Sequence, residues 1–187
     1  ITVPLGNDEA FLKRMTYVCE HLYPRPKLMI LNYPHNPTSM TVDEGFFETL
    51  VDVARRFNIA VIHDFAYGET CFDGYKAPSF LSVKGAEKVG VEFTTMSKPY
   101  NMAGFRVGFA AGNKDMLEAL ATIKGYYDYG IYQGIQIASI IAMRTCDDFI
   151  AQQNAKYQQR RDAVCEWLER IGWQVEKPRA SMFVWAR

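Results

Sequence analysis

The stretch TTMSKPYNMAGFRVGF, residues 94–109, holds a single lysine just after an apolar, β-prone run. Ser97 directly precedes Lys98, and Arg106 follows eight residues after the lysine. One interpretation of this stretch is a solvent-exposed turn. The other is a covalent site, in which the Lys98 amine is the nucleophile and the Arg106 guanidinium binds an anion beside it.

The apolar run before Lys98 is the third of a series. Residues 27–32, 58–64 and 91–96 each have the length and composition of a buried strand, and a helical pattern separates the first two. This strand–helix–strand order predicts parallel strands joined by a right-handed crossover. Residues 105–112 follow after a short glycine-containing link, which favours an antiparallel fourth strand that includes Arg106. We therefore expect an α/β fold with a mostly parallel sheet.

Several helices are expected around these strands. Thr41 and Glu44 form a T-x-x-E capping box, which predicts where the first helix begins. Helical patterns also cover 113–124 and 134–144. Residues 147–171 are expected to form one helix of about 36 Å, which is long for packing on one sheet and indicates a bridge between domains. The expected apolar stripe of this helix consists of Ile150, Tyr157, Val164 and Ile171, with Gly172 as the C-terminal stop.

Composition excludes several classes of protein. Lys and Arg number 21 and so do Asp and Glu, which gives no electrostatic reason to expect nucleic acid or an anionic membrane as a partner. No apolar run reaches the length that spans a bilayer. The four cysteines and three histidines show no metal-ligand spacing, which favours reduced thiols in a cytoplasmic protein. The strand-like ends ITVPL and SMFVWAR lead us to expect a piece of a longer chain.

Polar side chains follow the expected strands at one edge of the sheet, where open α/β sheets bind ligands. Together they offer an amide, a carboxylate, a phenol, two hydroxyls, an amine and a guanidinium. The set is Asn36, Asp64, Tyr67, Thr95, Ser97, Lys98 and Arg106. Each also has a purely structural interpretation: Asp64 as a turn residue, for example, or Arg106 in a surface ion pair worth only ~0–1 kcal/mol. Their convergence on one edge is what favours a site.

Pyridoxal phosphate is a cofactor that needs this set. Lys98 can form the Schiff base, and Asp64 can keep the ring nitrogen protonated. Asn36 and Tyr67 can bind the 3′ oxygen of the ring. The phosphate requires hydroxyls and a guanidinium, which Thr95, Ser97 and Arg106 can supply.

Three motifs carry a resemblance to a known family. They are YPHNPT (33–38), DFAYGE (64–69) and TMSKPYNMAGFRVG (95–108). In order and spacing they resemble the class I/II aminotransferases of the aspartate aminotransferase-like fold type I. The sequence around these motifs is most similar to the bacterial alanine (glutamate–pyruvate) aminotransferase branch, with diaminopimelate aminotransferases as near relatives. Thr95 departs from the family, which usually has Ser or Gly there, although a threonine hydroxyl can make the same bond.

The resemblance implies a domain organisation. Residues 1–146 would be the C-terminal half of the large cofactor-binding domain, a mostly parallel sheet with one antiparallel strand and helices on both faces. Residues 147–171 would be the interdomain helix, and 172–187 the beginning of the small α/β domain. The family's glycine–serine phosphate loop, its ring-stacking aromatic residue and its carboxylate-binding arginine have no counterpart in this sequence. We therefore expect the isolated chain to be inactive.

The resemblance also implies a function. It indicates a cytoplasmic, homodimeric aminotransferase that acts on small amino acids and 2-oxo acids, with Lys98, Asp64 and Tyr67 as catalytic residues. In aspartate-specific relatives an arginine reaches across the dimer interface, and the corresponding residues 126–134 here contain none, which favours alanine and glutamate as substrates. Alternatives are a carbon–sulfur lyase, an aminocyclopropane-carboxylate synthase, or a non-catalytic cofactor-binding module. A nicotinamide-binding domain is disfavoured, because no G-x-G-x-x-G follows a strand.

Overall fold

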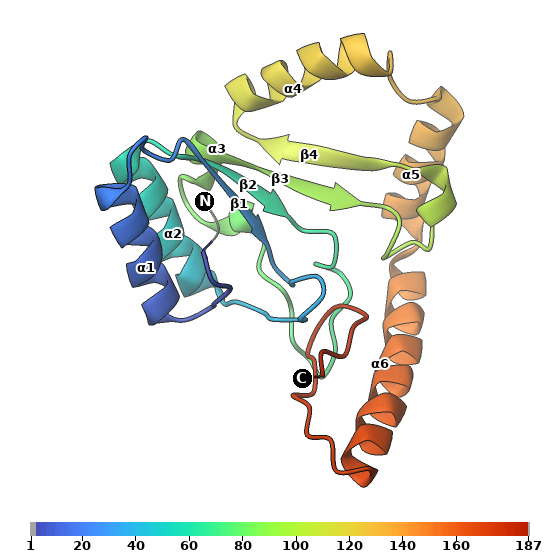
Figure 1. The fold of residues 1–187 in the computed structure, drawn as a ribbon. Helices are drawn as coiled ribbons and strands as arrows, with labels where there is room; N and C mark the ends of the chain where they lie inside the picture. Colours follow the sequence, from blue (N-terminus) through green and yellow to red (C-terminus); the bar gives the residue numbers. More distant parts are fainter. Residues whose placement is uncertain (1–2, 187) are drawn as a thin grey trace.

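One mixed sheet organises the chain, as seen in a computed structural model that describes residues 3–186 (Figure 1). Its strands are β1 (Leu28–Asn32), β2 (Ala60–Asp64), β3 (Gly90–Thr95) and β4 (Gly108–Gly112), hydrogen-bonded in that order. Strands β1, β2 and β3 are parallel, whereas β4 is antiparallel to β3. The sequence-based expectation of a mostly parallel sheet with one antiparallel strand is confirmed.

Helices surround this sheet. The α-helices are α1 (Glu9–His21), α2 (Glu44–Phe57), α3 (Ala86–Val89), α4 (Lys114–Tyr127), α5 (Gln133–Thr145) and α6 (Asp147–Arg170). Short 3₁₀ turns, η1 and η2, cover Phe80–Ser82 and Ala103–Phe105. Helix α1 was not anticipated. Its signal is Asp8, whose side chain accepts the Phe11 N–H as an N-cap.

Helices α1 and α2 lie side by side against one face of the sheet (Figure 1). They form the main core, in which Phe47 and Leu50 of α2 pack with Val61 of β2 and Phe80 of η1. The opposite face of β1 is more open, since Ile30 is 70% exposed. The alternation of buried and exposed residues along β1 and β2 is the period-2 pattern of strands covered on one face.

The start of α2 differs from the expected capping box. Asp43 is the N-cap, and its Oδ1 accepts the Phe46 N–H at 2.9 Å. Thr41 lies two residues earlier, too far along the chain to cap the first turn. Its hydroxyl instead accepts a hydrogen bond from Arg179 at 3.0 Å. The predicted N-cap, Thr41, was therefore wrong, and the true N-cap lies two residues later. Aspartate is as good an N-cap as threonine, so Asp43 directly before the helix takes the role.

Helix α6 is long, as expected, but its predicted apolar stripe was wrong. Among its residues only Arg161 and Leu168 are buried, while Val164 and the C-cap Ile171 are exposed. Arg161 docks the helix, because its Nη1 lies 2.6 Å from Asp73 Oδ2 and 2.7 Å from the Pro178 carbonyl oxygen. Its guanidinium also lies 4.9 Å from the centre of the Phe72 ring. A charged contact with a distant loop thus replaces the apolar one.

Helix α6 ends at Arg170, two residues before the expected glycine, Gly172. Gly172 has a φ of 81°, and the Gly172 and Trp173 N–H groups bond the Glu169 and Leu168 carbonyls. This is the Schellman arrangement of helix ends, in which the left-handed residue is most easily glycine. The C-terminal segment then turns back toward the loops that follow β1 and β2 (Figure 1). The Ser181 N–H donates to the Thr70 carbonyl there.

The strand-like ends do not form strands where the structure describes them. Residues 3–7 and 182–186 have no regular structure, and only Ala180 makes an isolated bridge, to Cys71. Residues 1, 2 and 187 lie outside the described part of the chain. Burial within a longer sheet is what an apolar run needs to become a strand, and these segments instead pack as irregular chain.

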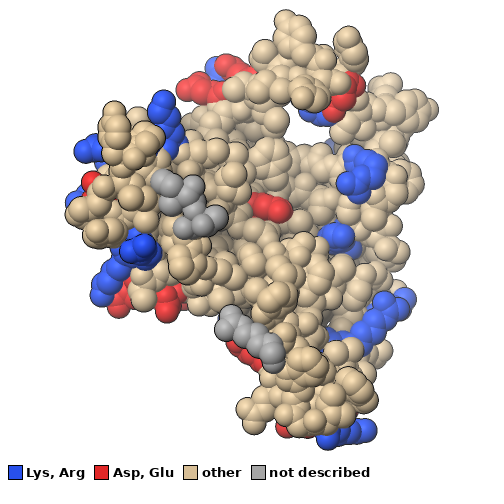
Figure 2. Space-filling view, in the orientation of Figure 1, with Lys and Arg blue, Asp and Glu red and all other residues tan. Residues whose placement is uncertain are grey.

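Charged side chains are spread over one face of the molecule. Lys and Arg side chains on the face shown in Figure 2 are interspersed with Asp and Glu and do not gather in one patch. No helix within residues 3–186 is both long and apolar enough to cross a bilayer. The four cysteines are free thiols.

Helix capping gives the first prediction. Asp43→Ala should lower the free energy of unfolding by about 1 kcal/mol, because the Phe46 N–H loses its acceptor. Asp43→Asn keeps an acceptor oxygen and should retain most of the stability. Urea unfolding of these variants measures both effects. A larger loss from Glu44→Ala than from Asp43→Ala would show that the capping box operates after all.

Candidate functional site

The site is built on the register of the parallel strands. Asn32, the last residue of β1, pairs with Asp64, the last residue of β2, and Asp64 pairs with Phe93 of β3. The Phe65 N–H continues this row by donating to the Phe93 carbonyl at 2.8 Å. The strand ends therefore meet at one edge of the sheet, as the sequence analysis required.

Asn32 ties the first turn to this edge. Its Nδ2 donates to the Asp64 carbonyl at 2.9 Å, and its Oδ1 accepts the Asn36 N–H at 2.6 Å. Asn36 itself is exposed at the tip of the 33–38 turn. Asn32 was missed by the sequence analysis, although an asparagine that ends an apolar strand just before a proline-rich turn is a usable signal.

Asp64 lies exposed at the end of β2. Its Oδ1 accepts the Ala66 N–H at 3.1 Å, which is the turn role that the structural interpretation assigned to it. This single bond orients the carboxylate without burying it. A ligand at the strand ends can therefore reach the carboxylate.

Tyr67 and Lys98 lie together. The Lys98 Nζ is 5.8 Å from the centre of the Tyr67 ring, within the range of a cation–π contact. Tyr67 is only 5% exposed. Burial raises the pKa of its phenol, and the negative charge of Asp64 raises it further. The phenol is thus a proton-bearing donor at neutral pH.

Phe183 is a second residue that the sequence analysis missed. Its ring packs edge-on against Tyr67, with the ring centres 5.3 Å apart. Its carbonyl accepts a hydrogen bond from Ser39, whose hydroxyl also lies 2.6 Å from the Ser181 hydroxyl. No local pattern indicates this contact, because it joins the C-terminal segment to residues that lie far earlier in the sequence.

The loop between β3 and β4 carries the remaining candidates. The Ser97 N–H donates to Thr95 Oγ1 at 3.0 Å, so these two residues form a tight turn in which Ser97 is buried and Thr95 half-buried. The loop is closed by Met96, whose N–H donates to the Val107 carbonyl. Met96, Met102 and Val107 pack with Ala142 of α5 in a second apolar cluster. Helix α5 therefore supports the loop that holds Lys98.

Arg106 is exposed on this loop. The sequence analysis placed it in the fourth strand, but it lies before β4. It has a left-handed backbone (φ 51°, ψ 48°) at the end of η2, and its Nη1 donates to the Ala103 carbonyl at 2.9 Å. Strand pairing starts only at Gly108, because the left-handed residue breaks the extended backbone. Gly108 pairs with Thr95, so Arg106 still lies at the strand-end edge.

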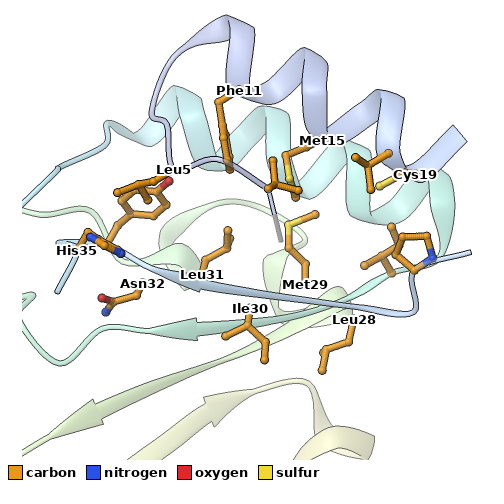
Figure 3. A pocket seen from close by; sticks show the side chains of 15 residues that line it. Leu5, Phe11, Met15, Cys19, Leu28, Met29, Ile30, Leu31, Asn32 and His35 are labelled. Carbon is orange, nitrogen blue, oxygen red and sulfur yellow. The ribbon is translucent and has the colours of Figure 1, made fainter. Parts of the chain in front are cut away.

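A cavity of about 540 Å³ lies elsewhere, between α1 and β1 (Figure 3). Phe11, Met15 and Cys19 of α1 and Met29 and Leu31 of β1 line it, and Asn32 and His35 stand at one end. Its lining is mostly apolar and includes no Asp, Glu, Lys or Arg, so it offers neither a carboxylate nor an amine. Within residues 3–186 no group of His, Cys, Asp and Glu side chains is placed to hold a metal ion. The strand-end edge is the candidate site.

Comparisons with known proteins all point to one family, the aminotransferases. The family described as "Aminotransferase class I and II" matches residues 1–187. Glutamate–pyruvate aminotransferase AlaC of Escherichia coli (strain K12) is 45% identical over 186 residues, which cover 100% of this chain and 45% of the relative. An LL-diaminopimelate aminotransferase of Moorella thermoacetica is 44% identical, over 98% of this chain and 47% of its own. The chain spans about half the length of these curated relatives.

Solved structures agree. Substrate-bound BacF from Bacillus subtilis is 34% identical with a TM-score of 0.83, over 96% of this chain and 43% of that chain. An aminotransferase from Staphylococcus aureus is 36% identical with a TM-score of 0.81, over 86% of this chain and 42% of that chain. The resemblance drawn from the three sequence motifs is confirmed. The chain belongs to the class I and II aminotransferases, a family that depends on pyridoxal phosphate.

Proposed function

We propose that the whole protein transfers an amino group between an amino acid, alanine or glutamate in the first place, and a 2-oxo acid. The observation that carries this proposal is the meeting of Asp64, Tyr67 and Lys98 at one sheet edge, with Lys98 Nζ 5.8 Å from the centre of the Tyr67 ring. An amine, a carboxylate and a protonated phenol are the groups that amino-group transfer uses. The amino acid and the 2-oxo acid are the small-molecule partners.

The residues at this edge fit pyridoxal phosphate by their chemical types. Lys98 would hold the cofactor covalently, and Asp64 would face its ring nitrogen. Asn36 and Tyr67 would bind the 3′ oxygen, for which the phenol of Tyr67 is suited because its raised pKa keeps it a donor. The hydroxyls of Thr95 and Ser97 and the guanidinium of Arg106 would bind the phosphate.

The mechanism assigns each residue a task. When bound, pyridoxal phosphate supplies an electron-withdrawing ring that acidifies the Cα–H of an attached amino acid. The Asp64 carboxylate would hold a proton on the ring nitrogen by charge attraction. Lys98 Nζ would move the proton at Cα as general base and acid. Tyr67 would orient the ring through a hydrogen bond in which its phenol is the donor.

The domain assignment remains part of the proposal. Residues 1–146 would be half of the large domain, 147–171 the interdomain helix, and 172–187 the beginning of the small domain. The docking of α6 through Arg161 onto Asp73 supports this division, because it gives the long helix a fixed contact with the sheet domain. A cytoplasmic location is proposed with it.

A homodimer is also proposed. From the end of α4 to the start of α5 the tyrosines are highly exposed, since Tyr126, Tyr127, Tyr129 and Tyr132 are 77–92% exposed. Tyrosine is enriched in protein interfaces, where its large ring contributes contact area. A second copy of the chain would cover them.

Diaminopimelate is a second candidate substrate. It is favoured by the 44% identity to a protein named LL-diaminopimelate aminotransferase, which is close to the 45% identity to AlaC. The two candidates use the same residues at the sheet edge and differ only in what contacts the substrate side chain.

Covalent labelling tests the proposal. The whole protein with cofactor should absorb visible light, and borohydride reduction should fix the cofactor on Lys98. Mass spectrometry of the digested protein locates the label. Its recovery on Lys84, Lys88 or Lys114 would overturn the assignment.

Asp64→Asn tests the ring-nitrogen contact. The variant keeps the shape and the bond to the Ala66 N–H but removes the negative charge, so turnover should fall by orders of magnitude while the visible absorbance of the bound cofactor persists. Asp52→Asn, an exposed change on α2, is the matched control and should leave turnover unchanged. Near-normal transamination by Asp64→Asn would mean that this carboxylate is a turn residue alone.

Substrate choice gives a further prediction. Because residues 126–134 contain no arginine, no guanidinium from this segment can bind a side-chain carboxylate. We expect kcat/KM for alanine to exceed that for aspartate, measured with 2-oxoglutarate as acceptor. A preference for aspartate contradicts the assignment, and a preference for diaminopimelate selects the second candidate.

A further inference from the structure

His63 is the residue just before Asp64, and its side chain is completely buried. Its Nδ1 lies 2.9 Å from Glu92 Oε2 on β3, and its Nε2 lies 3.0 Å from the Tyr33 carbonyl oxygen, just beyond β1. The rings of Phe47, Phe65 and Phe80 surround it, with centres 5.0–6.3 Å away. A polar side chain is thus held in an apolar environment by two bonds to different strands.

The partners of His63 fix the orientation of its ring. The Tyr33 carbonyl can only accept, so Nε2 is the donor in that bond. Glu92 is held in turn, because it accepts from the Ser79 hydroxyl and the Phe80 N–H, both at 2.7 Å. His63 and Glu92 therefore form one buried hydrogen-bonded chain that runs from beyond β1 to β3.

This hydrogen-bonded chain crosses the sheet at the row that builds the site. Tyr33 directly follows Asn32, and Glu92 directly precedes Phe93, so the His63 bonds run beside the Asn32–Asp64–Phe93 register. The three strands that His63 joins are the ones that carry Asn36, Asp64 and Lys98. Backbone ladders align the strands along their length, and His63 adds a side-chain link at their ends.

We propose that His63 is a positioning residue, whose buried hydrogen bonds hold the three strand ends in the arrangement that the cofactor needs. The inference rests on the proposed function. His63 lies on the covered face of the sheet, so it acts through Tyr33 and Glu92 and not by touching the cofactor. The other groups that face it are the uncharged rings of Phe47 from α2, Phe65 after β2 and Phe80 from η1.

Nitrogen NMR on the whole native protein tests the hydrogen bonds of His63. With ¹⁵N-labelled histidine, the His63 ring should show a proton on Nε2 that exchanges slowly with water, because the Tyr33 carbonyl accepts it in a buried position. The signal is assigned by its loss in His63→Phe. An Nε2 without a proton, or a proton that exchanges as fast as that of an exposed imidazole, would overturn the proposal. This measurement needs neither cofactor nor activity.

Cofactor binding tests the positioning role. His63→Phe alone leaves the buried Glu92 carboxyl without one of its hydrogen-bond partners, so the informative variant is His63→Phe with Glu92→Gln, which removes the His63–Glu92 contact from both sides. Val61→Ala is the matched control, because Val61 is equally buried on the same strand and face. The dissociation constant of pyridoxal phosphate, followed by its visible absorbance, should rise roughly tenfold to a hundredfold in the double variant, since displaced ligands lose orientation. It should stay near the native value in Val61→Ala.

The outcomes separate the two proposals. A native whole protein that binds no pyridoxal phosphate would refute the proposed function. A native protein that binds it, together with a double variant whose affinity matches that of Val61→Ala, would refute the role of His63. If the double variant at saturating cofactor loses kcat while its KM is unchanged, this supports the role of His63, because Lys98 and Asp64 would then be misplaced.

Discussion

The register between β1, β2 and β3 is the constraint on which the rest of the structure depends. It sets Asn32, Asp64 and Phe93 side by side, and from these positions the chain reaches Asn36, Tyr67 and Lys98 within a few residues. Parallel strands make this possible, because all of them end at the same edge. A slip of one residue in any strand would turn its terminal side chain to the opposite face of the sheet and remove it from the site.

Other parts of the chain support this edge from a distance. Helix α5 packs under the loop that holds Lys98, and the C-terminal segment brings Phe183 against Tyr67. That segment is held in turn by Arg161, which bonds Asp73 and the Pro178 carbonyl. Packing the edge between the sheet core and the C-terminal segment keeps Tyr67 buried while Asp64 stays accessible, and that combination suits the proposed cofactor site.

The sequence predicted local features well and long-range ones poorly. Strands β1, β2 and β3 and the antiparallel β4 were recognisable from short apolar runs, and the candidate residues that follow β1, β2 and β3 lie at one edge of the sheet. The stripe of α6 was wrong because Arg161 finds Asp73 far along the chain, which no helical period shows. The contacts of Phe183 and of His63 were missed for the same reason. Arg106 was misplaced because a left-handed residue can end a strand without any proline or glycine at that position.

The central claim is that strand register brings the Asp64 carboxylate to the ring nitrogen of the cofactor. The most direct test is ¹⁵N NMR of the whole protein loaded with pyridoxal phosphate that is labelled at its ring nitrogen. The account predicts the chemical shift of a protonated ring nitrogen near neutral pH. The shift of an unprotonated ring nitrogen in the native protein would contradict it.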